Sequence, residues 1–451
     1  MKRRSFLKAA AAGAAPMFVP SHVFGQAGRP GANDRIKVGL IGFGGRARWL
    51  MQYIGDDVPE AELVAVADCY LPRTQGRDPG GAPTAMSDKA AKWAKYQYFQ
   101  KMFEKEKLDA VFIETTCHAR VWCAIHALQA GLDVYAEKPI SLTVEEGRAL
   151  VNATRKYNRI LQAGSQQRSI PINRYASELV RTGKIGPIQS VIVCNYLPGL
   201  QWTPQPGQPV PEGLDWDLWC NQTELRPYHP LLHRSWANYV DYDGGGSSWG
   251  VSGWGTHGLD QVQCALGLDN TGPVELWTED WKTIDRPNFS MARSPMWQPV
   301  LGRKPIMMRF PTGTVVRLEE PCRGGSIEEG GHDQLGGIFV GTDGVIKIIR
   351  GNFSTNRPEL LKDAPPPTKE GRGEDLFHLK NFFECLRTRQ KPNADVETAH
   401  RATSLCHLAN ICRQLDRRLR WNPKAEKFIG DEEANKLLSR PRRKGFELPS
   451  A

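Results

Sequence analysis

The feature that most constrains this chain is a glycine-rich turn that directly follows a run of strand type. Residues 36–41 are mostly apolar, and a stretch of helical character begins after the turn. The turn reads Gly42, Phe43, Gly44, Gly45, Arg46 and Ala47. The first glycine permits a tight turn, the second lets a pyrophosphate approach the backbone, and Ala47 allows close packing of helix on strand. This arrangement predicts a dinucleotide-binding βαβ unit.

Three further buried-strand patterns lie at residues 62–68, 109–114 and 133–137, with helical stretches between them. Strands that alternate with helices pair in parallel, so residues 34–162 are predicted to form a doubly wound, Rossmann-type α/β domain. Over residues 163–451 the pattern changes to alternating strands, long loops rich in Gly, Pro and Trp, and two long helices. That pattern predicts a second, α+β domain built on a mixed or antiparallel sheet.

An acidic residue ends the second strand pattern. Asp68 stands 24 residues after Gly44. A carboxylate at that position suits hydrogen bonding to a ribose diol and repels a 2′-phosphate, so it favours NAD over NADP as the cofactor. Arg46 and Arg73 are able to assist a 2′-phosphate, and they keep NADP open.

Composition and charge exclude several classes of protein. With 40% hydrophobic and 24% charged residues, the chain of 451 residues is globular rather than disordered. No apolar run approaches the roughly 20 residues that span a bilayer, which excludes an integral membrane protein. The net charge of +10 includes a basic cluster at residues 440–444, which we interpret as a solvated end and not as a nucleic-acid site. Ten cysteines without a Cys-x-x-Cys pair predict mostly buried free thiols and no metal site.

The first 33 residues have the order of features of a removable export signal. Basic residues at positions 2–8 precede a weakly apolar stretch, Ala9–Pro20, and small residues follow near Ala27. The paired Arg3 and Arg4 resemble the twin-arginine pattern, whose export machinery translocates folded proteins. We therefore expect a periplasmic protein that carries any tightly held cofactor out with it.

Three later motifs, together with the glycine turn, resemble the Gfo/Idh/MocA oxidoreductases. They are Glu137-Lys138-Pro139, Thr115-Thr116-Cys117-His118, and Gly255-Thr256-His257-Gly258-Leu259-Asp260. Residues 214–219 and 419–423 resemble the exported bacterial branch of that family. The resemblance covers the mature chain and implies a Rossmann domain, a second domain with an open-faced sheet that forms dimer or tetramer contacts, and NAD or NADP in the cleft between them.

The resemblance also implies roles for single residues. Lys138 would lie between the nicotinamide ribose and the substrate, where its cation eases deprotonation of a hydroxyl, and His257 would be the general base. Further cofactor contacts are implied for Thr115, Thr116, His118, Glu137 and Gln166. Arg168 follows a predicted strand of the second domain and is a candidate lining residue of the cleft.

Two departures from the family pattern concern the chemistry. Members commonly carry an aspartate four residues before the catalytic histidine, and this chain has Gly253 there. The Thr-Pro loop of the family reads Thr115-Thr116, and Arg120 stands at the place of a second histidine. Neither change affects cofactor binding, but both question ordinary alcohol dehydrogenation.

Tryptophans point to the kind of substrate. Of thirteen in the chain, five fall in polar, glycine-rich loops expected near the cleft: Trp202, Trp216, Trp219, Trp249 and Trp254. Indole faces stack on the apolar faces of sugar rings. Carbohydrate or polyol substrates are therefore expected, with Trp216, Trp254, Arg168 and Tyr196 as candidate substrate contacts.

Three functions follow from these features. The first is an NAD(P)-dependent oxidoreductase that acts on a secondary alcohol of a sugar, glycoside or polyol, with a tightly bound cofactor and a homo-oligomeric form. The second is a redox-neutral, NAD-dependent glycoside hydrolase that oxidises, eliminates, adds water and reduces back, with His257 and Tyr196 as acid and base. The third is a non-catalytic sugar-binding protein, motivated by the carboxylate missing at Gly253.

Overall fold

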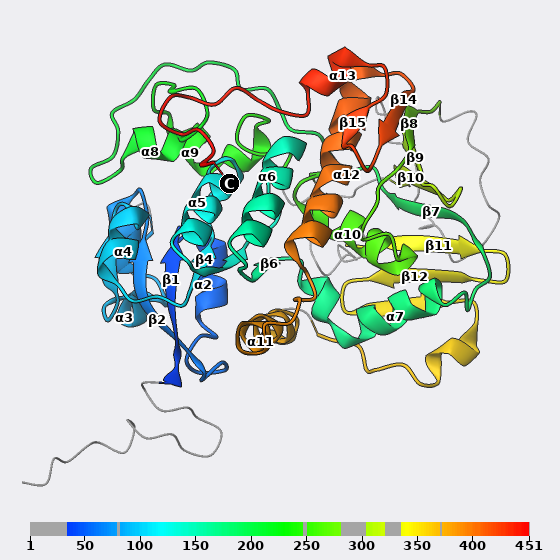
Figure 1. Cartoon of the computed structure of the whole chain (residues 1–451), viewed down its shortest axis with the longest axis horizontal. Helices are drawn as coiled ribbons and strands as arrows, with labels where there is room; N and C mark the ends of the chain where they lie inside the picture. Colours follow the sequence, from blue (N-terminus) through cyan, green and yellow to red (C-terminus); the bar gives the residue numbers. More distant parts are fainter. Residues whose placement is uncertain are drawn as a thin grey trace, which may run out of the picture.

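The structure is a computed structural model that describes residues 34–78, 82–246, 250–280, 304–320, 335–369 and 372–450. The expected export signal and Trp249 lie outside this part of the chain. Each half of the molecule is built on its own sheet, as Figure 1 shows. The predicted fold class, a parallel α/β sheet followed by a mixed sheet, is confirmed.

The N-terminal sheet has six strands in the order β3-β2-β1-β4-β5-β6, and all its pairs are parallel. The strands are β1 (Ile36–Ile41), β2 (Ala61–Ala67), β3 (Ala94–Tyr96), β4 (Ala110–Ile113), β5 (Asp133–Ala136) and β6 (Leu161–Ala163). The helices are η3 (Leu71–Gln75), α2 (Gly45–Met51), α3 (Ser87–Ala90), α4 (Phe99–Lys105), α5 (Cys117–Gln129) and α6 (Val144–Lys156). The four predicted strands are all present, and β4 and β5 are buried throughout because helices cover both faces.

One covering helix comes from the far end of the chain. α11 (Arg372–Thr388) lies between the two halves in Figure 1. Its Phe382 ring packs against Phe112 of β4 and Tyr135 of β5, with ring centroids 5.6 and 5.7 Å apart. This return of the chain places the first turn of α11 beside α2 and the carboxyl edge of the N-terminal sheet, where Asp375 bonds Arg46.

The second sheet has nine strands in the order β13-β12-β11-β7-β10-β9-β8-β14-β15. Its pairs are antiparallel except that β10 runs parallel to β7. The strands are β7 (Ile188–Cys194), β8 (Glu275–Thr278), β9 (Ile306–Arg309), β10 (Val315–Glu320), β11 (Gly337–Gly341), β12 (Val345–Ile349), β13 (Asn352–Thr355), β14 (Leu419–Asn422) and β15 (Lys427–Phe428). Its helices are η4 (Gln166–Ser169), α7 (Pro171–Arg181), α10 (Trp254–Leu266), η8 (Pro358–Leu361), α12 (Val396–Leu415) and α13 (Glu432–Lys436).

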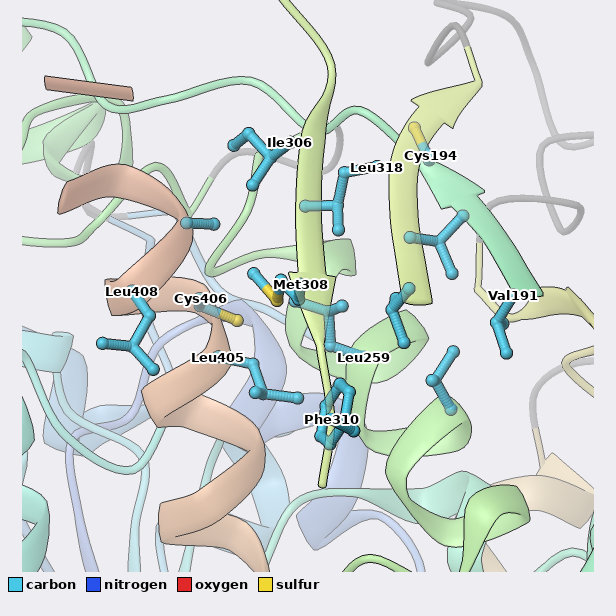
Figure 2. Close-up of a cluster of buried hydrophobic side chains, with 14 of the residues drawn as sticks. Val191, Cys194, Leu259, Ile306, Met308, Phe310, Leu318, Leu405, Cys406 and Leu408 are labelled. Carbon is cyan, nitrogen blue, oxygen red and sulfur yellow. The ribbon is translucent and has the colours of Figure 1, made fainter. Parts of the chain in front are cut away.

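Helices α10 and α12 cover the second sheet and form its core. Figure 2 shows Leu405 of α12 beside Met308 of β9, and Leu408, Leu259 and Leu318 belong to the same buried cluster. Each such side chain, when fully buried, contributes about 1.5–3 kcal/mol. This packing fixes the first turn of α10, which carries His257, against the sheet.

Residues 195–246 and 250–253, here called the strap, lie between β7 and α10 in the sequence and cross back over the N-terminal half (Figure 1). The strap contains α8 (Trp216–Cys220), α9 (Pro230–Arg234) and η5 (Trp236–Asn238). It is tied to the end of β2 by backbone hydrogen bonds, from Leu71 N to Gly213 O and from Asp215 N to Cys69 O, both 2.9 Å. The strap is therefore docked on the N-terminal half as well as joined to its own half.

The basic cluster near the C-terminus is not a solvated end, which corrects the expectation from the sequence. Arg442 is largely buried and donates to Glu146 and Gln222, and Arg443 donates to Asp217 of the strap. Buried arginine needs such acceptors, and the strap and α6 supply them. The tail thus fastens the strap to the N-terminal half.

Eight of the described cysteines are free thiols, as expected, and Cys194 is disulfide-bonded. No helix within the described ranges is long and apolar enough to cross a membrane. Across the same residues, no three His, Cys, Asp or Glu side chains gather as a metal site requires.

Candidate functional site

Two cavities lie side by side at the carboxyl edge of the N-terminal sheet. The first, of about 410 Å³, is lined by the glycine turn and is called the glycine-turn cavity. The second, of about 450 Å³, contains Lys138 and is called the lysine cavity. Four residues line both: Arg46, Glu114, Thr115 and Trp236. A ligand in one cavity can therefore reach a ligand in the other.

The glycine turn leaves its backbone open to the first cavity. Gly42 has a φ of +86°, and a Cβ there would lie 2.9 Å from the carbonyl carbon of Glu114, so the sharp turn needs glycine. A Cβ on Gly44 or Gly45 would meet nothing within 4 Å, and both residues line the cavity. The turn therefore offers bare backbone to a phosphate group.

Asp68 stands at the end of β2 with both carboxylate oxygens held. Oδ2 accepts from Phe43 N at 2.7 Å, and Oδ1 accepts from Tyr70 N at 2.8 Å. The carboxylate lines the glycine-turn cavity together with Arg73. The Phe43 side chain is fully buried against Trp93 and does not line the cavity, so Phe43 contributes through its backbone.

Arg46 lines both cavities, but two carboxylates hold its guanidinium. Its guanidinium binds Glu137 at 2.9 Å and Asp375 at 2.7 Å. Because both carboxylates already bind Arg46, it is not available to a 2′-phosphate. Arg73, which lines the cavity together with Asp68, remains able to bind one. Asp375 lies in the first turn of α11, and no sequence motif predicted it as a site residue.

Lys138 follows β5 and is half-buried. Its Nζ donates to Gly253 O at 2.9 Å. Burial lowers the pKa of Lys138 to about 8, although Glu137 and Asp243 act in the opposite direction. The ammonium is therefore mostly charged at neutral pH and loses its proton within reach of ordinary assay conditions.

His257 lies in the first turn of α10 and is buried. Burial holds the pKa of His257 well below its usual range, and the nearby Arg350 and Lys138 lower it further. The imidazole is therefore neutral. Its Nδ1 is buried without a hydrogen-bond partner among the described residues.

Asp243, on the strap, is a lining residue of the lysine cavity that sequence reasoning missed. Its side chain is 2% exposed and accepts from Ser252 Oγ. Burial raises the pKa of Asp243 to about 6, although Ser252, Arg120 and Lys138 favour the charged form. The sequence signal was weak, because an acid before Gly244 in a glycine-rich loop resembles an ordinary turn residue.

The structure brings most of the predicted site residues to one of the two cavities. The glycine-turn cavity has Gly42, Gly44, Gly45, Arg46, Asp68, Thr115 and Thr116. The lysine cavity has Glu137, Lys138, Gln166, Trp254 and His257. Three unpredicted charged residues, Arg350, Glu374 and Asp375, also line it. They come from the end of β12 and from α11, far from every motif.

Besides the ring of Phe43, four predicted side chains lie away from both cavities, which corrects their expected places. His118 is fully buried, with Nε2 2.8 Å from Trp219 O. Arg168 is buried in ion pairs of 2.8 Å with Asp260 and Asp269. Such pairs satisfy an arginine internally and leave it no group for a substrate.

Tyr196 and Trp216 are the other two. Tyr196 is fully buried beneath α10, where a Cβ on Gly255 would lie 3.1 Å from its ring. Trp216 stacks on Trp219 with ring centroids 4.4 Å apart and donates its indole N–H to Arg226 O. Both are core residues, whereas Trp219 and Trp236 line the glycine-turn cavity.

These residues fit a dinucleotide. Bare glycine backbone for a pyrophosphate, a fixed carboxylate for a ribose diol, and a buried Thr115 hydroxyl that lacks a partner among the described residues all face one cavity. The cavity continues into the one that holds Lys138 and His257, where a second molecule would bind.

Comparison with known proteins agrees with the geometry. Residues 36–165 match the family model GFO_IDH_MocA, described as an oxidoreductase family with an NAD-binding Rossmann fold. Residues 186–289 and 339–448 match the model of its C-terminal alpha/beta domain. Together the two models cover more than half of the chain.

Two curated relatives and one solved structure illustrate the likeness. The scyllo-inositol 2-dehydrogenase (NAD(+)) of Bacillus subtilis is 26% identical over 152 residues, which are 34% of this chain and 42% of that protein. Glycosyl hydrolase family 109 protein 1 of Bacteroides fragilis is 27% identical over 123 residues, 27% of this chain and 26% of that protein. The chain thus spans less than half the length of these relatives. The WlbA dehydrogenase of Bordetella pertussis, solved with NADH and UDP-GlcNAcA, shares the fold with a TM-score of 0.54 at 18% identity, covering 86% of this chain and 99% of that one.

Proposed function

Because the chain belongs to the Gfo/Idh/MocA oxidoreductase family, we propose that it transfers a hydride between a nicotinamide cofactor and a secondary alcohol of a sugar, glycoside or polyol. The observation that carries the proposal is that the two cavities are adjacent and share Arg46, Glu114, Thr115 and Trp236 in their linings. Lys138 and His257 stand in the second cavity. A substrate held there lies next to the cofactor site.

The charge states of Lys138 and His257 support this chemistry. The cofactor supplies the hydride acceptor when it is bound. Lys138, fixed by Gly253 O, is able to donate a hydrogen bond to the substrate oxygen and to stabilise the alkoxide character that develops there. The neutral imidazole of His257 is able to accept the hydroxyl proton as the carbon–hydrogen bond breaks. Each group is thus in the form that its role requires at neutral pH.

We further propose that the cofactor is NAD and that the protein retains it. The fixed Asp68 carboxylate disfavours a 2′-phosphate. The strap adds Leu218, Trp219, Asn221, His233, Arg234 and Trp236 to the wall of the glycine-turn cavity. Those side chains narrow the exit of the cofactor. Retention suits a protein exported in the folded state, as residues 1–33 predict, because no free nicotinamide pool exchanges with it outside the cytoplasm.

A retained cofactor also favours redox-neutral glycoside cleavage as a second candidate. The relative from Bacteroides fragilis is named a glycosyl hydrolase, and it is 27% identical to this chain over 123 residues. Tyr196 is too deeply buried to act as its acid or base, so Lys138 and His257 would have to carry the proton steps. The non-catalytic alternative rested on the carboxylate that is missing at Gly253. Asp243 supplies a carboxylate to the lysine cavity, so this reason no longer applies.

The decisive experiment uses the protein without residues 1–33, purified without added nucleotide. Denaturation followed by mass analysis should release stoichiometric NAD. The purified protein is then assayed on polyols, sugars and aryl glycosides, with reduced cofactor and aglycone followed separately. Accumulating reduced cofactor supports the oxidoreductase, and aglycone release without it supports the glycosidase. Lack of nicotinamide and of all turnover would refute the proposal.

Two further expectations stay proposals. Export through the twin-arginine machinery to the periplasm rests on residues 1–33, and a fusion of those residues to a folded reporter tests it. Formation of a homo-oligomer rests on the family resemblance, and sedimentation of the purified protein tests it.

A further inference from the structure

We propose that Asp243 is a positioning residue of the lysine cavity, whose carboxylate stabilises the Lys138 ammonium and so keeps that lysine able to donate to the substrate oxygen. The inference rests on the proposed hydride transfer, in which Lys138 is the donor. It concerns a residue of the strap that no motif of this sequence predicted.

The geometric basis is a pair of anchors at the start of α10. Asp243 accepts from Ser252 Oγ, and Lys138 Nζ donates to the carbonyl oxygen of the next residue, Gly253. Adjacent anchor residues bring the carboxylate and the ammonium to the same wall of the lysine cavity, and both groups line it. No ion pair joins the two among the described residues, so the carboxylate acts on the ammonium through its charge and not by direct contact.

Two other acids that line the lysine cavity are already paired with an arginine. Glu137 and Asp375 are bound by Arg46 at 2.9 and 2.7 Å, which offsets their charge. Asp243 has no such arginine pair within the described residues, and its side chain is 2% exposed. A buried carboxylate that makes no direct ion pair acts strongly on a nearby cation, because the local dielectric is low.

The charged groups around Asp243 and Lys138 determine how the loss of the Asp243 charge changes the pKa of Lys138. Lys138 is faced by Glu137 and Asp243, which favour its charged form, and by Arg46 and Arg350, which disfavour it. Asp243 is faced by Arg120 of α5 and by Lys138. The thiols Cys117 and Cys406 and the imidazole of His257 also lie near the pair, and they are neutral. Removal of the Asp243 charge leaves the two arginines less opposed, so Lys138 should lose its proton at lower pH.

The test follows the Lys138 ammonium directly, in the whole protein with its cofactor. Lysine labelled with ¹³C at Cε gives a signal that is assigned with Lys138→Arg and titrated between pH 5 and 10. In Asp243→Asn the pKa of Lys138 should fall by about one unit, the scale of a buried charge pair. Asp241→Asn is the matched control, because Asp241 lies on the same strap but pairs with Arg226 at 2.7 Å. It should leave the titration unchanged.

Activity and the unaltered protein supply independent readouts. The alkaline limb of the kcat/KM profile should shift in Asp243→Asn with the Lys138 titration, and Asp243→Glu should restore it. In the unaltered protein the Lys138 signal should also show a small step near pH 6, where the pKa of Asp243 lies. That step needs no variant, so it remains a test if Asp243→Asn does not fold.

The outcomes separate this inference from the proposed function. A Lys138 pKa that differs by less than about 0.2 units between Asp243→Asn and the unaltered protein, or a titration without the step near pH 6, would overturn the role of Asp243. Absence of turnover on every alcohol and glycoside would instead overturn the proposed function, while the Lys138 titration still reports on Asp243.

Discussion

The glycine-turn cavity and the lysine cavity are neighbours, yet they are assembled in different ways. The floor of the glycine-turn cavity is formed by the ends of β1, β2 and β4, which are neighbours in the sheet, and by the residues that directly follow them. The lysine cavity is built from α2, β5, the strap, α10, β12 and α11, which span residues 46 to 375. The glycine turn and Asp68 are thus local in sequence, whereas the strap wall of the same cavity and the charged groups of the lysine cavity come together only in the folded protein.

The two cavities also differ in how charge is handled. In the glycine-turn cavity the Asp68 carboxylate is satisfied by backbone N–H groups before any ligand arrives. In the lysine cavity, negatively and positively charged side chains lie close to one another, and several of them shift the pKa of a neighbouring group. A rigid cradle next to a cavity of tuned groups is the arrangement expected where one binds a cofactor and the other moves protons.

The largest expected effect tests whether the two cavities have separate tasks. Lys138→Ala removes the donor to the substrate oxygen, and kcat should fall about 1,000-fold, within the range for a positioned acid or base. Because Lys138 does not line the glycine-turn cavity, the amount of nicotinamide that co-purifies should stay the same. Steady-state kinetics and mass analysis measure the two effects. Equal loss of both would show that the cavities cannot be separated.

A change on the other side should have the opposite pattern. Gly44→Val places a branched side chain in open space of the glycine-turn cavity, so cofactor affinity should fall about 100-fold while stability stays within about 0.5 kcal/mol. Gly42→Ala is the contrast, because its φ of +86° and the 2.9 Å approach to the Glu114 backbone should cost about 1–3 kcal/mol of folding free energy. Calorimetry and nucleotide titration separate them. Strong destabilisation by Gly44→Val would show that this glycine serves the fold and not the ligand.

The same contrast explains what the sequence could predict. The strand, turn and acid pattern of β1 and β2 predicted the cradle, because each of these features acts over a few residues. It could not predict that Arg168 and Tyr196 are core residues, because their burial depends on α10, which joins them only in three dimensions. Asp243 and Asp375 were missed for the same reason, since long-range packing alone brings them to Lys138 and Arg46.

The C-terminal tail is expected to influence the cofactor through the strap. Arg443 donates to Asp217 and to the carbonyl of Asn221, and Asn221 lines the glycine-turn cavity. Arg443→Ala should loosen this wall and release the cofactor about 10-fold faster, the equivalent of roughly 1.4 kcal/mol. Lys444→Ala is the control, because Lys444 is exposed and forms no hydrogen bond or ion pair with the described residues of the strap. Cofactor dissociation is timed by dilution into a nucleotide scavenger. An unchanged rate would mean that the tail fastens the strap without closing the cavity.

The smallest effect concerns stability at high pH and follows from the burial of Lys138. Its pKa is about 8 in the folded protein and near 10.5 in the unfolded chain, so the unfolded chain holds more protons between these values. The free energy of unfolding should therefore rise with pH from about 8 to 10 by this contribution. Lys138→Met removes the titrating group, so the gain in urea midpoint between pH 8 and pH 10 should be smaller in that variant. The variant Gly44→Val should keep the full gain in urea midpoint, because it changes the other cavity and leaves Lys138 in place. If Lys138→Met and the unaltered protein showed the same pH response, the burial of Lys138 would not contribute to the pH dependence of the free energy of unfolding.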